Sequence, residues 1–545
     1  MDTNKLAELL FPQIDKEPAY YESLYPEREL PCGAMVTRIG PSPTGFVHLG
    51  NLYNAIIGER LAHQSGGAFY LRVEDTDAKR EVPGAVELLL SSMDYFGIDF
   101  DEGECVDKPG IYGPYRQRQR KEIYQTFAKE LVRRGLAYPC FCTEERLSSM
   151  REEQMANKDN FGYYGKWALC RDLSFEEIEA RIQNGEEYVL RFRSTGDINN
   201  TLELADGIRG LLKLQENYQD FVLLKSDGIP TYHFAHVVDD HLMRTTHVVR
   251  GEEWLSTAPI HAQLFDTLGW ERPVYCHTTV LMKMDGDTKR KLSKRKDPEL
   301  GLNYYRQEGY VPEAVWEYLL TLLNSNYEEW RMENPEASID AFPFSLEKMS
   351  SSGALFDMMK FDSVSQETLL RMPVGEIYDK MSAWLLEYDP EFAKLFTKDR
   401  DFSERIIGVG REGARPRKDL TNWKQARQFL SFYFDETFVQ DDPYPENVSP
   451  EDRAEILKRY LETYNHADDN SEWFQKVREI AADMNYAIKP KDYKKNPDQY
   501  KGSITDVSNV IRVAVVGRCN SPDLWEICHI IGEDKMRNRV KKGMK

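Results

Sequence analysis

The sequence predicts an α/β fold in which an inserted α+β domain interrupts a parallel sheet and a helical module follows. A strand, a glycine- and proline-rich turn, a helix and a second strand succeed one another between residues 35 and 73. A helical crossover of this kind makes the two strands parallel. Strand-like and helical patterns then mix over residues 111–231, and after about residue 300 the apolar residues recur at helical spacing.

Length and composition are those of a multi-domain globular protein. The chain has 545 residues, 41% of them hydrophobic and 30% charged, and at ~150 residues per domain this predicts three or four domains. The 71 basic and 91 acidic side chains give a net charge of −20. This balance argues at first sight against a nucleic-acid partner, because lysine and arginine make the phosphate contacts. Binding nevertheless needs only a local basic patch.

Several classes of protein are excluded early. Residues 1–10 include Asp2, Lys5 and Glu8 and so lack the apolar core of a signal peptide. The sequence has no apolar run of the eighteen or more residues that a membrane span needs. Eight cysteines in a chain of this length are too dilute for a disulfide scaffold. We therefore expect a reduced, cytoplasmic protein without a membrane segment.

The first structural unit is a strand–turn–helix–strand sequence. Met35–Ile39 is rich in β-branched residues and predicts a strand. The two prolines and two glycines of Gly40–Gly45 predict a turn. Asn51–Gln64 has apolar residues near helical spacing and ends at Gly66-Gly67, so it predicts a helix. Ala68–Val73 predicts the second strand of this βαβ unit.

The middle of the chain mixes the two patterns. Gln117–Arg134 predicts an amphipathic helix, while Glu187–Arg193 and Gln219–Leu224 predict strands. Thr231–Asp240 and His247–Arg250 then return to apolar, strand-like runs. We expect these last two runs to complete the parallel sheet that the inserted domain interrupts.

The last third is predicted to be mostly helical, and only Val510–Val516 is favoured as a strand. The aromatic run Trp423–Phe434 is more typical of a helix core than of a base-stacking platform. Five segments predict helices: Pro312–Leu323, Asp419–Asp435, Arg453–Tyr464, Glu472–Met484 and Pro522–Ile531.

The first chemical motif, Phe46–Gly50, lies where the turn meets the first helix. Helix N-termini present unpaired N–H groups and bind anions. His48 could donate a hydrogen bond to a phosphate there, and Gly50 allows a flat base to approach closely. An isolated His-x-Gly is usually only a turn histidine. Its place inside a βαβ unit favours a nucleotide site, although the motif is neither a Walker A loop nor a GxGxxG fingerprint.

The second chemical motif is the basic run Lys283–Lys296, which is anomalous in an acidic protein. A charge run is usually a solvated face. At the centre of this one, Lys291 and Lys294 flank Leu292 and Ser293, so two lysines three residues apart can reach one polyphosphate. Phosphoryl chemistry depends on positioning and charge neutralisation, which such lysines supply.

Together the two motifs resemble the HIGH and KMSKS signatures of class I aminoacyl-tRNA synthetases. The resemblance narrows to bacterial glutamyl-tRNA synthetases, is dense from about residue 35 to 325, and thins after about 365. Arg295 at the end of the second signature is also typical of that group. Four further segments carry the resemblance: Arg38–Gly45, Arg72–Asp77, Tyr232–His241 and Val249–Trp254.

The resemblance implies a Rossmann-like parallel-sheet catalytic domain with an inserted α+β domain, followed by helical stem-contact and all-α anticodon-binding domains. Residues 33–110 and 232–284 would form the two halves of the catalytic domain. The remaining boundaries are expected at residues 1–32 (N-terminal extension), 111–231 (inserted connective, acceptor-binding domain), 285–380 (KMSKS-type loop and helical stem-contact domain) and 381–545 (helical anticodon-binding domain).

The activity that the resemblance implies is that of a glutamate–tRNA ligase. Such an enzyme activates L-glutamate with ATP and Mg²⁺ to an adenylate, releases pyrophosphate and esterifies the terminal adenosine of tRNA(Glu). Whether tRNA(Gln) is also charged is left open. The family is usually monomeric, so we expect a monomer.

By position in the motifs, Arg38, Tyr232 and Arg250 would hold the side-chain carboxylate of glutamate. A guanidinium is the best partner for a buried carboxylate, so the residue types agree with this role. Ser42 and Glu74 would take the α-carboxylate and ammonium end. The alternative for Arg250 is a structural ion pair with Glu252 or Glu253.

The resemblance also places the nucleotide. His48 and Gly50 would cradle ATP, with Trp254 near the adenosine. Lys291, Ser293 and Lys294 would form the catalytic loop, the two lysines stabilising the charge that moves onto pyrophosphate. No general base is expected, because the attacking α-carboxylate is already a nucleophile and needs only orientation. Four carboxylates near these motifs are expected to be structural: Asp75, Asp77, Asp239 and Asp240.

A zinc-binding segment of some bacterial members is similar to Cys140-Phe141-Cys142 with Cys170 downstream. The tyrosines Tyr163 and Tyr164 stand further from Cys170 than in that pattern. Zinc usually takes four nitrogen or sulfur ligands, and only three cysteines are available locally. Three ordinary thiols are therefore favoured over zinc.

Other functions fit the sequence less well. Arg38, Arg250 and the Pro-Ser-Pro-Thr-Gly turn argue against a glutaminyl-tRNA synthetase. The length and the helical third argue against a small nucleotidylyltransferase and against truncated relatives that glutamylate a modified tRNA base. A non-enzymatic RNA-binding paralogue would be expected to have lost motif residues that are present here. The basic run at 289–296 offers the local patch that tRNA needs despite the net charge.

Overall fold

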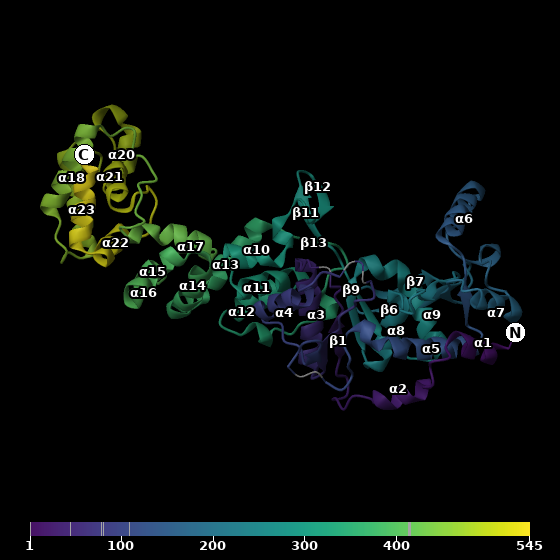
Figure 1. The fold of residues 1–545 in the computed structure, drawn as a ribbon. Helices are drawn as coiled ribbons and strands as arrows, with labels where there is room; N and C mark the ends of the chain where they lie inside the picture. The colour runs from purple at the N-terminus through teal and green to yellow at the C-terminus, as the bar shows by residue number, and fades with distance from the viewer. Residues whose placement is uncertain (1, 44, 78, 80, 108–109, 413–415) are drawn as a thin grey trace. The chain divides into compact units, whose positions relative to one another are not determined.

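The computed structural model describes residues 2–43, 45–77, 79, 81–107, 110–412 and 416–545 (Figure 1). The chain divides into two compact units. The first unit comprises the residues up to 304 together with 319–357, and the second comprises 305–318 and 358–545.

A layer of parallel strands forms the centre of the first unit, which confirms the predicted α/β class. β1, β2 and β3 pair in parallel in one sheet, and β6, β10 and β9 pair in parallel in another. β1 also lies against β9. Every residue of β1 and β2 is buried, as expected for strands with helices on both faces. The strands are β1 (Val36–Ile39), β2 (Ala68–Leu71), β3 (Glu102–Gly103), β6 (Thr201–Asp206), β9 (His247–Gly251) and β10 (Val274–Thr278).

The predicted βαβ unit is confirmed. Helix α3 (Leu49–Ser65) follows β1 and packs against β1 and β2. It ends at Gly66, whose φ of 72° is the left-handed conformation that favours glycine at a helix end. At Gly67 a Cβ atom would lie 1.9 Å from the carbonyl oxygen of Met35. Only glycine therefore lets the chain re-enter the sheet beside β1.

The run Thr231–Asp240 is not a strand, as predicted, but belongs to helix α8 (Tyr232–Leu242). Residues 234–240 of this helix are all buried, and its polar face, with His236, Asp239 and Asp240, is turned into the buried ionic network rather than to solvent. Two adjacent valines add a local strand preference, which the tertiary burial overrides. The expected strand at His247–Arg250 is confirmed as β9.

The segment between β3 and α8 forms a second layer, built on a sheet of its own. β4 (Ala137–Cys140), β5 (Val189–Phe192) and β8 (Val222–Leu224) make an antiparallel sheet. The hairpin of β6 and β7 (Gly210–Gln215) comes from the same stretch of chain, yet β6 pairs with β10 of the central layer. The helices of this segment are α5 (Lys121–Arg133), α6 (Glu144–Asn157) and α7 (Phe175–Gln183).

The N-terminal residues lie on this layer as two helices, α1 (Thr3–Leu10) and α2 (Pro18–Leu24), which pack along α5 (Figure 1). The buried Lys129 ammonium donates to the carbonyl of Ile14 over 2.7 Å and to the Glu8 carboxylate over 2.8 Å. Apolar packing and the hydrogen bonds from Lys129 therefore both hold this extension in place.

A hairpin of β11 (Leu281–Asp285) and β12 (Thr288–Lys291) leaves the central layer, and β13 (Ala354–Leu355) pairs in parallel with β11. α9 (Ala258–Leu268) packs on α8. The remaining helices of the unit include α4 (Ala85–Tyr95) and α12 (Tyr327–Glu333), and the chain passes between the units within α10 (Leu302–Glu308) and α11 (Pro312–Leu323).

The second unit is helical, as predicted, around one apolar core. Its helices are α13 (Met358–Arg371), α14 (Val374–Tyr388), α15 (Pro390–Phe396), α16 (Arg400–Gly408), α17 (Trp423–Leu430), α18 (Pro450–Thr463), α19 (Asn470–Asp483), α20 (Pro490–Lys495), α21 (Ile504–Val516), α22 (Leu524–Ile531) and α23 (Glu533–Gly543).

The predicted strand Val510–Val516 is wrong, because these residues form the second half of α21. Ser503 and Asp506 make a capping box that starts this helix, and burial on every side hides its period. The aromatic run 423–434 is confirmed as core, since Trp423, Tyr433 and Phe434 are buried. Among the described residues, the helices are all too short or too polar to cross a membrane.

Candidate active site

His48 stands at the N-terminus of α3, at the carboxyl end of β1. Its backbone N–H donates to the Asn51 side-chain oxygen over 3.0 Å, which fixes the first turn of the helix. The Nδ1 atom of its ring is buried and has no hydrogen-bond partner. A Cβ atom on Gly50 would lie 3.0 Å from that Nδ1 atom. Glycine therefore leaves the face of the imidazole free.

The imidazole of His48 is neutral at physiological pH. Burial, with a smaller contribution from the nearby Lys294 and Lys291 ammonium groups, lowers its pKa to about 4. A neutral ring keeps one N–H donor and one acceptor. It can therefore donate to a phosphate oxygen without adding charge.

The lysine motif is held as a loop by Asp297, which is 2% exposed. Its carboxylate accepts two hydrogen bonds from the Arg290 guanidinium, over 2.6 and 2.8 Å, and one from the backbone N–H of Ser293 over 2.8 Å. The hydrogen bonds from Arg290 hold the pKa of Asp297 well below its usual range. Lys291 and Lys294 are themselves exposed, so the loop presents them for a ligand.

The two motifs meet around one cavity of about 370 Å³. A neighbouring cavity of about 210 Å³ shares His48 and Lys294 and includes Ser42, which lies on the turn after β1. The larger cavity is lined by His48 and Gly50 of the first motif and by Lys291, Ser293 and Lys294 of the second.

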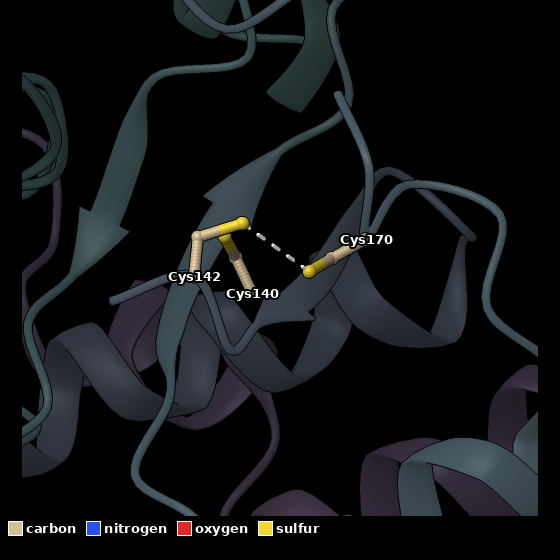
Figure 2. A group of neighbouring side chains, drawn as sticks. All are labelled: Cys140, Cys142 and Cys170. Carbon is tan, nitrogen blue, oxygen red and sulfur yellow. Dashed lines mark hydrogen bonds between the residues drawn. The ribbon is translucent and has the colours of Figure 1, made fainter. Parts of the chain in front are cut away.

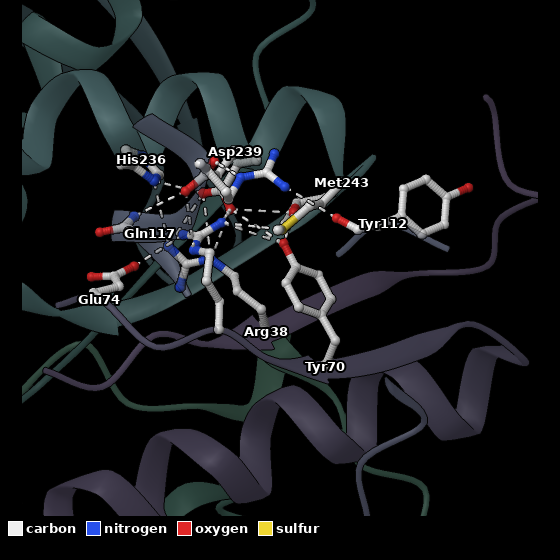
Figure 3. Close-up of polar contacts among 12 residues, drawn as sticks. Arg38, Tyr70, Glu74, Tyr112, Gln117, His236, Asp239 and Met243 are labelled. Atoms are coloured by element: carbon white, nitrogen blue, oxygen red, sulfur yellow. Dashed lines mark hydrogen bonds and ion pairs between the residues drawn. The ribbon is translucent and has the colours of Figure 1, made fainter. Parts of the chain in front are cut away.

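Arg38 and Arg72 lie at the carboxyl ends of β1 and β2 in a buried polar network beneath helix α8 (Figure 3). Arg38 Nε is 3.2 Å from Asp240 Oδ1, and Arg72 Nη1 is 2.6 Å from the same oxygen. Burial would lower the pKa of Arg38, but the Asp240 carboxylate outweighs it and raises that pKa. Arg38 therefore stays charged although it is 4% exposed.

Glu74 ends this network on the other side of Arg72, 3.0 Å from Arg72 Nη2. Burial raises its pKa, and the positive charges of Arg72 and Arg38 only partly offset this effect. A Cβ atom on Gly40 would lie 2.3 Å from Glu74 Oε1. The glycine in the turn thus makes room for this carboxylate.

Arg250, on β9, has two of its three nitrogens fixed. Nε donates to His277 Nε2 over 3.0 Å, and Nη1 lies 3.1 Å from His261 Nδ1. Nη2 is buried and has no hydrogen-bond partner. The predicted alternative, an ion pair with a following glutamate, does not hold for Glu252, which instead contacts Arg209 over 2.6 Å.

Tyr232 joins the two arginines from the first turn of α8. Burial raises its pKa, with smaller effects from the nearby charges of Arg250, Glu74 and Arg38. Its ring lies 4.2 Å from that of Trp254, which belongs to a 3-10 turn, η4 (Glu252–Thr257). The structure thus places Trp254 against Tyr232, and its expected position near the adenosine stays a prediction.

The carboxylates predicted to be structural have structural partners. Asp239 accepts hydrogen bonds from Arg120, over 2.6 Å, and from Tyr124 over 2.7 Å. Asp75 accepts the backbone N–H of Arg118 over 2.9 Å. Five further members of the site are not predicted from the sequence. Arg290 and Asp297 pair with each other within the lysine motif, and the others have partners on other elements: Arg72, His261 and His277.

The sulfur atoms of Cys140, Cys142 and Cys170 gather where β4 ends (Figure 2), all within 4.8 Å of one another. The Cys142 and Cys170 sulfurs are 3.7 Å apart. Tyr163 supplies an oxygen 3.4 Å from the sulfurs of both Cys140 and Cys142. The sequence predicts three ordinary thiols at this position, and folding brings the oxygen of Tyr163 beside two of them.

Comparisons with known proteins agree with this site. Residues 34–362 match the model of the class I tRNA synthetase catalytic domain (E and Q), and residues 377–544 match an anticodon binding domain. A glutamate–tRNA ligase of Acetivibrio thermocellus is 58% identical, over 99% of this chain and all of its own length. One from Clostridium perfringens is 48% identical, over 99% of each chain.

A solved glutamate tRNA ligase from Elizabethkingia meningosepticum, in complex with its amino acid, has the same fold. It is 27% identical and superposes with a TM-score of 0.73 over 94% of this chain and 99% of its own. These relatives confirm the resemblance to the glutamyl group and do not favour the glutaminyl alternative. The catalytic-domain match and the end-to-end relatives show that the chain belongs to the glutamate–tRNA ligases of the class I tRNA synthetases.

Proposed function

We propose that this chain joins L-glutamate to ATP in the cavity between the two motifs and then transfers the glutamyl group to tRNA(Glu). The observation that carries the proposal is the meeting of His48 and Gly50 with Lys291 and Lys294 around one cavity. These residues lie far apart in the sequence, and folding brings groups suited to binding phosphate together from the two motifs.

In the first step, a carboxylate oxygen of the glutamate α-carboxylate attacks the α-phosphorus of MgATP. A new O–P bond forms, the bond to the β-phosphate oxygen breaks, and pyrophosphate leaves with the bond electrons. Lys291 and Lys294 stabilise the charge that develops on pyrophosphate. His48 donates one neutral hydrogen bond to a phosphate oxygen, in agreement with its lowered pKa of about 4.

Selection of glutamate follows from the charges around the three buried arginines Arg38, Arg72 and Arg250, which we call the arginine end of the site. The guanidiniums of Arg38 and Arg72 contact the carboxylates of Asp240 and Glu74, whereas Arg250 contacts two imidazoles and no carboxylate. The side-chain carboxylate of L-glutamate would give Arg250 the directly paired negative charge that it lacks. Glutamine is neutral and would leave a buried guanidinium uncompensated, which is costly.

Within this end, we assign the side-chain carboxylate of glutamate to Arg38, Tyr232 and Arg250. The free Nη2 atom of Arg250 supports this assignment, because a buried guanidinium N–H without a partner needs an acceptor. Ser42 and Glu74 take the α-carboxylate and the ammonium group. Trp254 packs on Tyr232 and supports its ring.

In the second step, a terminal ribose hydroxyl of the tRNA attacks the carbonyl carbon of the adenylate, and AMP leaves. The helical second unit, which matches an anticodon binding domain, supplies the surface that selects the tRNA. We propose tRNA(Glu) as the substrate, with tRNA(Gln) as the second candidate, and we expect the enzyme to act as a cytoplasmic monomer.

ATP–pyrophosphate exchange with the full chain tests this proposal. We expect exchange with glutamate in the presence of tRNA(Glu), and at most background exchange with glutamine. Exchange with glutamine alone would overturn the assignment. Charging of tRNA(Glu) and tRNA(Gln) in parallel then decides whether one or both are substrates.

We also propose that the thiols of Cys140, Cys142 and Cys170 hold a zinc ion, with Tyr163 as the fourth donor. At a Zn–S distance of about 2.3 Å, tetrahedral ligands stand about 3.8 Å apart, and the Cys142 and Cys170 sulfurs are 3.7 Å apart. Hydrogen bonding among the thiols lowers the pKa of Cys140 and raises that of Cys142, so one thiolate is favoured before any metal binds, and zinc binding would release the remaining thiol protons. The ion would be structural, because the cluster packs among buried residues.

Elemental analysis of the purified full chain tests the zinc site. We expect about one zinc per chain and its loss in Cys142→Ser. The matched control is Cys105→Ser, since Cys105 is an exposed cysteine outside the cluster. A chain purified without chelators that contains no zinc, and takes up none when the ion is added, would contradict the site.

A further inference from the structure

Arg250 is oriented by a second residue, His277, and His277 by a third, Asp206. The Arg250 Nε–H donates to His277 Nε2 over 3.0 Å, and His277 Nδ1 lies 2.6 Å from Asp206 Oδ2. His277 and Asp206 are 0% and 4% exposed. The three side chains form a buried chain of hydrogen bonds that ends at the guanidinium.

The hydrogen bonds fix which nitrogen of His277 carries the proton. The Asp206 carboxylate can only accept, so the proton lies on Nδ1 and leaves Nε2 as the acceptor for Arg250. Burial lowers the pKa of His277, which keeps the ring neutral and Nε2 unprotonated. The opposite tautomer would point an N–H group at the Arg250 Nε–H.

Asp206 is itself held rigidly at the end of β6. Its Oδ1 accepts the backbone N–H groups of Ile208 and Arg209, each over 2.9 Å, and its Oδ2 also accepts the backbone N–H of His277 over 3.2 Å. Burial would raise its pKa, but the hydrogen bonds from His277 and from the backbone outweigh that effect and lower it. The carboxylate is therefore charged and immobile.

The rest of the Arg250 side chain is fixed from other directions. The guanidinium lies 4.4 Å from the centre of the Tyr275 ring, and Nη1 is 3.1 Å from His261 Nδ1. Only Nη2 is left without a hydrogen-bond partner. A planar guanidinium fixed at Nε and Nη1 can aim its Nη2 in a single direction.

We propose that Asp206 and His277 are positioning residues that aim Arg250 Nη2 at the side-chain carboxylate of glutamate. This inference rests on the proposed role of Arg250 and extends it to two residues that do not touch the substrate. Asp206 comes from the hairpin of β6 and β7, which joins the central layer through β10. The selection of the amino acid thus depends on a strand from the inserted stretch of chain.

Two substitutions at residue 277 separate the links of the chain. In His277→Gln the side-chain oxygen can occupy the place of Nε2 and still accept from Arg250. In His277→Asn the amide can occupy the place of Nδ1 and bond Asp206, but it falls short of Arg250. We expect His277→Asn to raise the KM for glutamate about tenfold or more, and His277→Gln to raise it less than threefold.

Asp206→Asn tests the tautomer. In this variant the Asn oxygen can still accept the two backbone N–H groups, and its NH₂ group then faces His277 Nδ1. That contact favours the tautomer of His277 that is protonated on Nε2, which cannot accept a hydrogen bond from Arg250. We expect a rise of about tenfold in the KM for glutamate with an unchanged KM for ATP. NMR of ¹⁵N-histidine-labelled full chain should report Nδ1–H in the wild type and Nε2–H in Asp206→Asn.

The matched control is His241→Gln, because His241 also contacts a carboxylate, Glu22, over 2.8 Å but lies away from Arg250. It should leave both KM values unchanged. The inference is overturned if the KM values for glutamate and ATP rise together in His277→Asn, if neither changes, or if wild-type His277 carries its proton on Nε2. The NMR measurement of the wild-type tautomer does not depend on the folding of any variant. An inactive wild type would instead contradict the proposed function.

Discussion

The Lys294 ammonium of the second motif lies 3.9 Å from the centre of the Phe46 ring of the first motif. A cation above an aromatic face is attracted by the ring's negative charge density. The contact holds the lysine over the mouth of the cavity that also contains His48. The loop is thus positioned for ATP by direct contact between the two motifs.

Lys294→Ala should slow adenylate formation about 100-fold while changing the KM for glutamate less than twofold. Its contact with the departing pyrophosphate strengthens in the transition state, and removing one such donor costs roughly this much. ATP–pyrophosphate exchange with tRNA(Glu) present measures both quantities. Lys296→Ala is the control, because Lys296 points to Asp285, 3.7 Å away, and does not line the cavity. Equal effects of the two variants would contradict this role.

Asp297→Asn should lower the exchange rate about tenfold, because charged hydrogen bonds from Arg290 and the bond from the Ser293 N–H hold the loop. Asp285→Asn removes another carboxylate partner of the same arginine, 2.7 Å away, but its side chain is 51% exposed. That control should change the rate less than twofold. A larger loss in Asp285→Asn would show that Asp297 does not organise the loop.

Arg250→Gln should raise the KM for glutamate by roughly 10- to 100-fold, the range expected for lost hydrogen bonds between charged groups. The KM for ATP should stay within twofold, and discrimination against glutamine should weaken. Steady-state charging at varied glutamate and glutamine concentrations measures these changes. Arg272→Gln is the control, since that arginine pairs with Asp266 at the surface. Unchanged discrimination in Arg250→Gln would remove this residue from the site.

His63 gives a pH-dependent contribution to stability away from the site. Hydrogen bonds to Asp101, over 3.1 Å, and to Glu59, over 2.8 Å, raise its pKa from 6.5 to about 10. A raised pKa stabilises the fold fully below about pH 6.5, and this contribution declines as the pH rises and is gone above about pH 10. Urea unfolding should show His63→Gln less stable than wild type at pH 6 and equally stable above pH 10. A gap that widens with pH would contradict this sign.

The sequence predicts those features that are local. The βαβ unit follows from β-branched residues, glycines and prolines within a short stretch, and His48 and Lys291 are recognised by their neighbours in the chain. Helix α8 has buried polar groups opposite its apolar face, and the second half of α21 is apolar on nearly every side, so both segments resemble strands in the sequence. The partners of Arg250 come from other elements, and the contacts of the Tyr163 oxygen with two of the cysteine sulfurs form only when the chain folds. Such contacts depend on tertiary packing, which a linear pattern does not contain.

We propose above all that this site charges tRNA with glutamate. The most direct measurement is acid-precipitable incorporation of radiolabelled glutamate or glutamine into tRNA(Glu) by the full chain with MgATP. We expect glutamate to be incorporated, to depend on Lys294, and to exceed glutamine by at least about 100-fold. Incorporation of glutamine at a comparable rate, or none of either amino acid by folded enzyme, would contradict the account.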